Sequence, residues 1–302
     1  MFKSKNSMSR ALVRRETTAG YLFLLPSLFF FVTFVLYPMF LCIYTSFFDS
    51  NMGKNAVDVF VGLGNYKELF QDKLFLGALK NTVIIVVVAV PTVCAFSLWV
   101  ATAIYDMKPA LTSAFRCIFY LPVVTGSVAV TVVWKWMYNN RFGVFNYLFK
   151  SLGIIDQNIN WLGDARFALW CIILILFTTS VGQPIVLYVS ALGNVDHSLV
   201  EAAQVDGANR RQVFWKIKWP SIMPTTLYVL VITTINTFQC FALIQLLTKG
   251  GPLNSTMTIM YQVYDTAYRL NDLGYACAIG VVLALIIAIF SAIQFKVAKT
   301  DN

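Results

Sequence analysis

The sequence predicts an all-α, polytopic membrane protein with six transmembrane helices. Of its 302 residues, 58% are hydrophobic and only 12% are charged, whereas a soluble domain usually carries about 25% charged residues. Six stretches contain no Lys, Arg, Asp or Glu, and each is long enough to cross a hydrocarbon core about 30 Å thick. Helices are expected because backbone N–H and C=O groups find no water partner in lipid.

The six charge-free stretches place the spans along the chain. They are residues 21–48, 81–105, 117–134, 167–195, 219–248 and 273–295. The first stretch is far longer than the apolar region of a secretory signal peptide, so we expect it to be a retained helix. A transmembrane domain over 21–296 is therefore flanked by an N-terminal segment, 1–20, and a C-terminal tail, 297–302.

Basic residues indicate how the chain is oriented, because Lys and Arg are enriched on the cytoplasmic side. Segments 1–20, 106–116, 196–218 and 296–302 hold more than half of the 23 Lys and Arg residues. We therefore expect these segments, and both termini, to be cytoplasmic, and residues 49–80 to face outward. The net charge of +9 is explained by membrane orientation, so no nucleic-acid partner is expected.

The chain lacks the residues that enzymes and metal sites need. No phosphate-binding P-loop, G-x-S-x-G elbow or H-E-x-x-H helix is present, and His197 is the only histidine. The six cysteines show no CxxC spacing. Charged residues are also missing from the span centres, where ion-coupled transporters carry them. We expect no catalytic residue, no metal and no cofactor on this chain, and an energy source outside it.

Uncharged polar residues enter the fourth and fifth spans. Gln183 lies in the fourth, and Thr233, Asn236 and Gln239 lie in the fifth. Such residues either hydrogen-bond between helices or line a path for a hydroxyl-rich solute. The amides of Asn236 and Gln239 are the stronger path candidates, because an amide in an apolar helix needs a partner.

Small residues recur every four positions along the sixth span. Residues four apart share one helix face, so the pattern predicts close approach of another helix, from this chain or from a second subunit. The stripe consists of Ala276, Gly280, Ala284, Ala288 and Ala292.

The connector between the fourth and fifth spans, 196–220, is longer than a simple loop requires. Ser198 stands three residues before Glu201, the spacing of a helix capping box, and predicts a short helix to Val205. Gly207 breaks this helix. A second amphipathic helix is expected beyond it, from Val213, Phe214 and Ile217, with Pro220 closing it before the fifth span. Such a connector either lies on anionic headgroups or docks a soluble partner.

This connector resembles the EAA loop of permease subunits in binding-protein-dependent ABC importers. Glu201-Ala202-Ala203, Gly207, Ile217 and Pro220 stand at the family's spacing, with Trp219 where the family usually has Leu. Further stretches are similar to the carbohydrate branch of that family: Asn65-Tyr66, Phe119-Tyr-Leu-Pro122, Trp134-Lys-Trp136, Phe142-Gly143, Gly250-Gly-Pro252, Asn254-Ser-Thr256 and Asp272-Leu-Gly-Tyr-Ala276.

The resemblance implies a type I ABC importer permease fold in a bacterial cell membrane. It implies pairing with a second permease, two cytoplasmic ATPases that use ATP and Mg, and an extracytoplasmic solute-binding protein, with sugars or polyols, including glycerol-phosphate compounds, as substrates. A self-contained channel or facilitator for small polar solutes is the alternative. The residues that the resemblance assigns to ATPase coupling are Glu201, Ala202, Ala203, Asp206, Gly207, Ala208, Ile217 and Pro220.

Overall fold

The computed structural model describes the backbone of residues 3–51 and 58–300, and the side chains of 16–51 and 58–297. The regular secondary structure of the described residues is helical apart from one two-stranded antiparallel sheet and an isolated bridge between Asn51 and Asp272. Three five-residue π-helical turns, labelled η, interrupt the α-helices. In chain order the elements are α1 (Lys3–Phe31), η1 (Val32–Leu36), α2 (Tyr37–Thr45), β1 (Phe48–Asp49), β2 (Val59–Phe60), α3 (Gly64–Gln71), α4 (Lys73–Tyr105), α5 (Pro109–Val124), α6 (Ser127–Met137), α7 (Val144–Ser151), α8 (Ala168–Ser180), α9 (Gly182–Gly193), α10 (His197–Val205), α11 (Arg210–Val213), η2 (Phe214–Lys218), α12 (Trp219–Phe238), α13 (Ala242–Leu247), α14 (Ile259–Tyr264), η3 (Asp265–Arg269) and α15 (Leu273–Thr300).

Five helical stretches in the described part of the chain are long and apolar enough to cross a membrane. They are Glu16–Thr45, Lys73–Tyr105, Ala168–Gly193, Arg210–Leu247 and Leu273–Val297. These stretches overlap the first, second, fourth, fifth and sixth predicted spans. The predicted all-α, polytopic class is therefore confirmed.

The third predicted span, 117–134, is not a single straight helix. α5 and α6 meet at a bend of 94°, where Thr125 and Gly126 leave the helical conformation. Pro122 lies in the last turn of α5 and cannot donate a backbone hydrogen bond, which weakens the helix just before the bend. Counting the bent pair as one broken span gives the predicted six.

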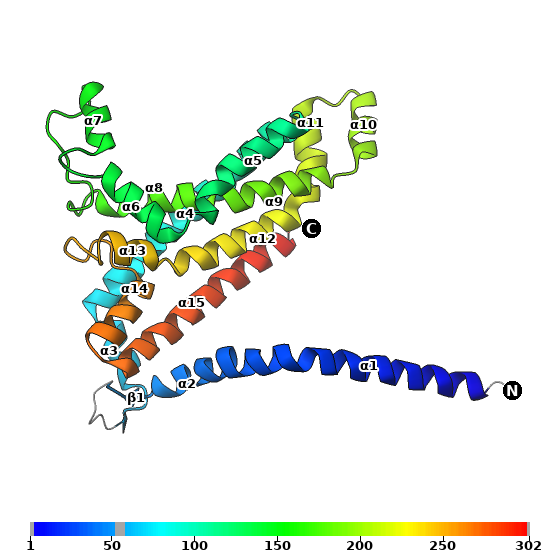
Figure 1. Cartoon of the computed structure of the whole chain (residues 1–302), viewed down its shortest axis with the longest axis horizontal. Helices are drawn as coiled ribbons and strands as arrows, with labels where there is room; N and C mark the ends of the chain where they lie inside the picture. Colours follow the sequence, from blue (N-terminus) through cyan, green and yellow to red (C-terminus); the bar gives the residue numbers. More distant parts are fainter. Residues whose placement is uncertain (1–2, 52–57, 301–302) are drawn as a thin grey trace.

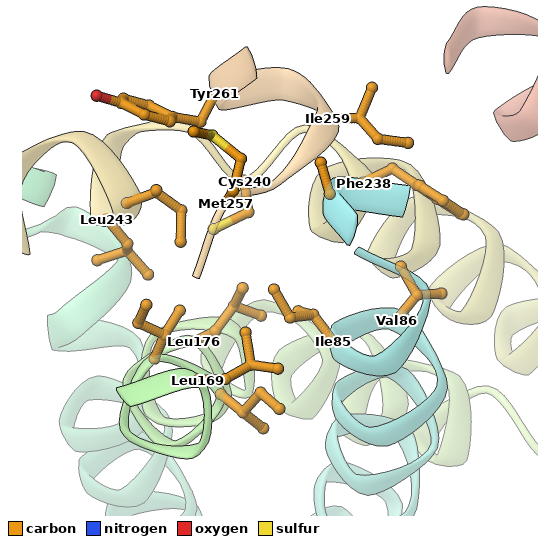
Figure 2. Packing of buried hydrophobic residues seen from close by; sticks show 14 of the residues in the cluster. Ile85, Val86, Leu169, Leu176, Phe238, Cys240, Leu243, Met257, Ile259 and Tyr261 are labelled. Carbon is orange, nitrogen blue, oxygen red and sulfur yellow. The ribbon is translucent and has the colours of Figure 1, made fainter. Parts of the chain in front are cut away.

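The core is arranged around α4, which packs against α8, α9 and α12. Figure 2 shows part of this core, where Ile85 and Val86 of α4 cluster with Leu169 and Leu176 of α8 and with Phe238 of α12. Lipid tails are as apolar as these side chains. In a membrane, such contacts therefore stabilise the fold by close packing, not by exclusion of water.

The fourth span changes from α8 to α9 at Val181. The Val181 carbonyl accepts a hydrogen bond from the Ser97 hydroxyl of α4, at 3.2 Å. Gly182 then allows α9 to touch α5, because a Cβ at this position would lie 2.3 Å from the Phe119 carbonyl oxygen. Both contacts hold the start of α9 in place.

Gly182→Ala is expected to lower the stability of the permease, because overfilling a packed contact usually costs about 1–3 kcal/mol. Gly280→Ala is the matched control, since a Cβ at Gly280 would meet nothing within 4 Å. The measurement is the melting temperature in detergent, and the Gly182 variant should melt several degrees lower. Equal melting of the two variants would contradict this close contact.

The first span stands apart from the rest of the molecule. α1 leads away from the bundle (Figure 1), and the apolar window of this span has no buried residue. Only its far end, α2, packs against α15. On α15, Ala276 is buried, whereas Ala284, Ala288 and Ala292 are exposed, so most of the predicted small-residue stripe does not pack within this chain.

The bundle has two ends that carry different elements (Figure 1). α10 and α11 lie at one, together with the start of α1 and the end of α15. We refer to this as the α10 end. α3, α7, α13 and the sheet lie toward the opposite, α7 end.

Candidate functional site

α10 is a short helix at the α10 end of the bundle, and Asp196 caps its start. The Asp196 carboxylate accepts a hydrogen bond from the backbone N–H of Ser198 at 2.8 Å. Hydrogen bonds from Ser198 also lower the pKa of Asp196. The predicted cap, Ser198, is instead the second helical residue, so the predicted capping box with Glu201 is wrong. Asp and Ser are both favoured caps, and the spacing alone did not separate them.

α10 ends in a turn that depends on Gly207. The backbone N–H of Ala208 donates to the Ala203 carbonyl at 2.9 Å, and that of Gly207 donates to Gln204 at 3.0 Å. This pair of bonds is the Schellman motif, which requires a left-handed residue at the position after the helix cap. Gly207 occupies it with φ +82°. The predicted break of the helix at Gly207 is confirmed. The turn sets the direction in which the chain leaves α10.

The second helix of the connector begins at Arg210 and continues into the fifth span. Asn209 and Gln212 form a reciprocal capping box at its start, with hydrogen bonds of 2.9 and 2.8 Å. The sequence predicted that Pro220 ends this helix, but the helix continues through it. Pro220 stands at the second residue of α12, directly after the π-helical turn η2. The π-helical turn already departs from the α-helical hydrogen-bond pattern just before Pro220, which accommodates a residue that has no N–H to donate.

α10 has no buried residue in the described structure. Two of its apolar side chains are accessible to solvent or a partner: Leu199 is 55% exposed and Val205 is 88% exposed. Together with the exposed Ala202, they stand at three-residue intervals, so they share one side of the helix. Exposed apolar side chains grouped on one surface are typical of docking sites. Leu199 and Val205 were not predicted as site residues, although their spacing was visible in the sequence.

Two hollows flank α10 and bring most of the predicted coupling residues together. One of about 330 Å³ lies between α10 and α11, and it is lined by five of these residues: Ala203, Asp206, Gly207, Ala208 and Ile217. Glu201 instead lines a hollow of about 930 Å³ beneath the helix, with Tyr105, Arg210 and Lys218. Ala202 and Pro220 are exposed and line neither hollow. α10 is therefore flanked by two hollows and contacts the bundle core through the half-buried Val200.

Two of the predicted path residues share a surface of the fifth span. Asn236 and Gln239 are exposed, three residues apart at the end of α12. Tyr228, two turns earlier, is also 53% exposed. The helix is interrupted directly after this stripe, because Cys240 and Phe241 separate α12 from α13. Within the described structure, neither amide side chain has a hydrogen-bond partner.

The other two predicted path residues lie differently. Gln183 is exposed near the start of α9, directly after the break in the fourth span. Thr233 is only 5% exposed, on the side of α12 that packs within the chain. Its neighbour Thr234 is also buried, and it accepts a hydrogen bond from Gln294 of α15 at 2.8 Å. Thr233 is therefore not part of the exposed stripe. Three residues along a helix rotate a side chain by about 60°, so Thr233 and Gln239 lie on opposite sides of Asn236, and Thr233 falls on the buried face.

Among the residues that the structure describes, no cluster of His, Cys, Asp and Glu side chains could hold a metal ion. The chain's single histidine, His197, is exposed at the start of α10. The chemistry available at the two sites is therefore recognition by shape, hydrogen bonding and charge.

The chain is similar to known permease proteins over most of its length. The family described as binding-protein-dependent transport system inner membrane component matches residues 73–299. The lactose transport system permease protein LacF of Rhizobium radiobacter is 32% identical, over 96% of this chain and 97% of that protein. The multiple sugar-binding transport system permease protein MsmF of Streptococcus mutans is also 32% identical, over 93% and 95% of the two chains.

The fold also matches a solved structure. A chain of a bacterial alginate ABC transporter, in complex with an alginate pentasaccharide-bound periplasmic protein, superposes with a TM-score of 0.80. The match covers 93% of each chain at 23% sequence identity. At this identity the match establishes the fold alone.

Proposed function

This chain belongs to the family of binding-protein-dependent transport system inner membrane components and is a permease subunit of a sugar ABC importer; we propose that it forms half of the path along which a saccharide crosses the membrane. It is a transporter component, not an enzyme. ATP and Mg are used by two partner ATPases, and an extracytoplasmic binding protein delivers the solute. In this proposal the chain itself needs no cofactor.

The observation that carries the coupling role is the exposure of α10. α10 has no buried residue and touches the core of its own chain only through the half-buried Val200, yet the Schellman turn and the capping box set its direction. Exposed Leu199 and Val205 supply an apolar contact for a groove on an ATPase. We assign Glu201 and the small Ala202 and Ala203 to that contact.

The α10 end then faces the cytoplasm, with both termini on the same side. The basic residues of 196–218 agree with this orientation, because Lys and Arg are enriched in cytoplasmic segments. The exposed apolar stretch of the first span and the exposed alanines of α15 leave apolar surface for the second permease. The α7 end faces outward, toward the binding protein.

The path proposal rests on Asn236 and Gln239. An amide side chain facing lipid would lose its hydrogen bonds with water, which costs free energy. The exposed stripe of α12 is better suited to a water-filled path between the two permeases, where amides can bond sugar hydroxyl groups. Gln183, at the start of α9, is the third candidate for the same path.

Asn236→Leu and Gln239→Leu are each expected to reduce saccharide uptake about twofold to twelvefold, because one lost hydrogen bond is worth about 0.5–1.5 kcal/mol. Both variants should reach normal levels in the membrane and assemble with the partner subunits. Asn236→Gln, which retains the amide, should recover most of the uptake. The measurement is uptake of labelled saccharide into cells or vesicles. Unchanged uptake in both leucine variants, or loss of assembly, would refute the path role.

A further inference from the structure

A hollow of about 460 Å³ at the α7 end of the bundle is not part of either site described above. We call it the α7-end hollow. Its lining includes Lys135, Asn139, Arg141, Phe142, Asn160 and Leu247. Small-molecule sites commonly enclose about 300–1,000 Å³, so the hollow is large enough for one or two sugar rings.

The wall of the α7-end hollow is rigid because Asn146 joins the loops that form it. This side chain is 2% exposed and donates to the carbonyl oxygens of Asn140 and Ile159 at 3.1 and 3.0 Å. Its own oxygen accepts the indole N–H of Trp161 at 3.0 Å. At Gly143, a Cβ would lie 2.3 Å from the Asn139 carbonyl oxygen. These contacts therefore tie the loops to one another.

The α7-end hollow carries net positive charge. Lys135 and Arg141 are exposed, and neither forms an ion pair within the described residues. The lining has no carboxylate. Asp164, next to the hollow in sequence, is paired with Arg166 at 2.7 Å, and the hydrogen bonds from Arg166 lower its pKa to about 2. A concave surface lined by one sign of charge attracts ligands of the opposite sign.

The α7-end hollow also adjoins the proposed path. Leu247, in its lining, is the last residue of α13. α13 continues the fifth span beyond Asn236 and Gln239, and α6, which carries Lys135, packs against α13. A solute at this hollow would therefore lie at the outer end of the helix that carries the path residues.

On the basis of the proposed function, we propose that the α7-end hollow selects saccharides bearing a carboxylate or a phosphate group. Arg141 can present two parallel N–H donors to such a group, and Lys135 adds a second cation. The remaining amide donors of the lining suit sugar hydroxyl groups, and the exposed ring of Phe142 offers an apolar face.

The test measures ATP-dependent uptake by the complete importer in membrane vesicles. The probes are a uronic acid trisaccharide, a phosphorylated hexose and a neutral trisaccharide. The variant is Lys135→Gln with Arg141→Gln, and the control is Lys150→Gln, at an exposed lysine on α7 outside the hollow. We expect uptake of at least one anionic probe, with a KM raised about tenfold or more in the double variant and unchanged in the control. High salt should weaken uptake in the unmodified importer, because it screens exposed charges.

Two results would overturn this proposal. One is uptake of the neutral trisaccharide alone, which would leave the importer function intact while removing the anionic preference. The other is an equal KM for the anionic probe in the double variant and the control, as expected if Lys135 and Arg141 contact only the binding protein or solvent. ATP-dependent uptake of no saccharide at all would instead contradict the proposed function itself.

Discussion

Gly207→Val is expected to reduce saccharide transport about 5-fold to 30-fold while leaving membrane insertion and pairing with the second permease unchanged. Gly207 adopts φ +82°, and a Cβ there would meet nothing within 4 Å. The effect must therefore come from the backbone and not from a clash. A left-handed conformation costs a non-glycine residue about 1–2 kcal/mol, and a β-branched residue adopts it least readily. A cost of this size changes the population of the correct turn about 5-fold to 30-fold.

Gly153→Val is a closely matched control for this substitution. Gly153 also follows a helix with positive φ, +68°, and a Cβ there would also meet nothing within 4 Å. The helix it ends is α7, where the N–H of Ile154 donates to Phe149 and that of Gly153 donates to Lys150. The two variants therefore change the same kind of turn at opposite ends of the bundle. Transport at the unmodified level in Gly207→Val, or an equal loss in Gly153→Val, would refute the coupling role of Gly207.

The double variant Leu199→Asp, Val205→Asp is expected to lose the ATPase from the purified complex. Both side chains are exposed, so their replacement should leave the fold of this chain intact. In a docked complex, each new carboxylate would be transferred from water to an apolar contact without a partner. A single buried, unpaired charge at an interface costs several kcal/mol, and 1.4 kcal/mol already corresponds to a tenfold change in Kd.

Leu253→Asp provides the comparison for this double variant. Leu253 is 94% exposed, like Val205, but it lies in the connector after α13, toward the α7 end. The measurement is the amount of ATPase that copurifies with the tagged permease, normalised to the second permease. Leu253→Asp should retain the ATPase. Full retention in the double variant would show that α10 does not dock through its apolar side.

Most of the fold follows from the distribution of charge along the sequence. Five charge-free stretches correspond to continuous or slightly interrupted helices, because lipid leaves the backbone no alternative. The bend between α5 and α6 did not follow from that rule, since Thr125 and Gly126 are as uncharged as their neighbours. Similarly, Pro220 was expected to end a helix, but the helix continues through it after the π-helical turn η2. Local backbone geometry, unlike span position, is not encoded in hydrophobicity.

The candidate sites also combine features that the sequence predicts with features that depend on packing. Gly207 was predictable because a left-handed turn after a helix strongly favours glycine. The exposure of Leu199 and Val205 was not predictable, because it depends on which side of α10 faces the bundle. Thr233 was grouped with Asn236 on composition, yet the packing of α12 against α15 places them on different sides. The rotation of a span is determined by its neighbours, which the sequence of one helix does not specify.

The coupling role of α10 is tested most directly by cross-linking from Ala202. A single cysteine at this exposed position, in a variant without the six native cysteines, would carry a photoactivatable group in the assembled importer. A cysteine at Ser151, exposed at the end of α7, serves as the control. The expected result is a covalent product with the ATPase from position 202 and none from position 151. Products with lipid alone from position 202 would contradict docking of α10 on the ATPase and favour a helix that lies on the membrane surface.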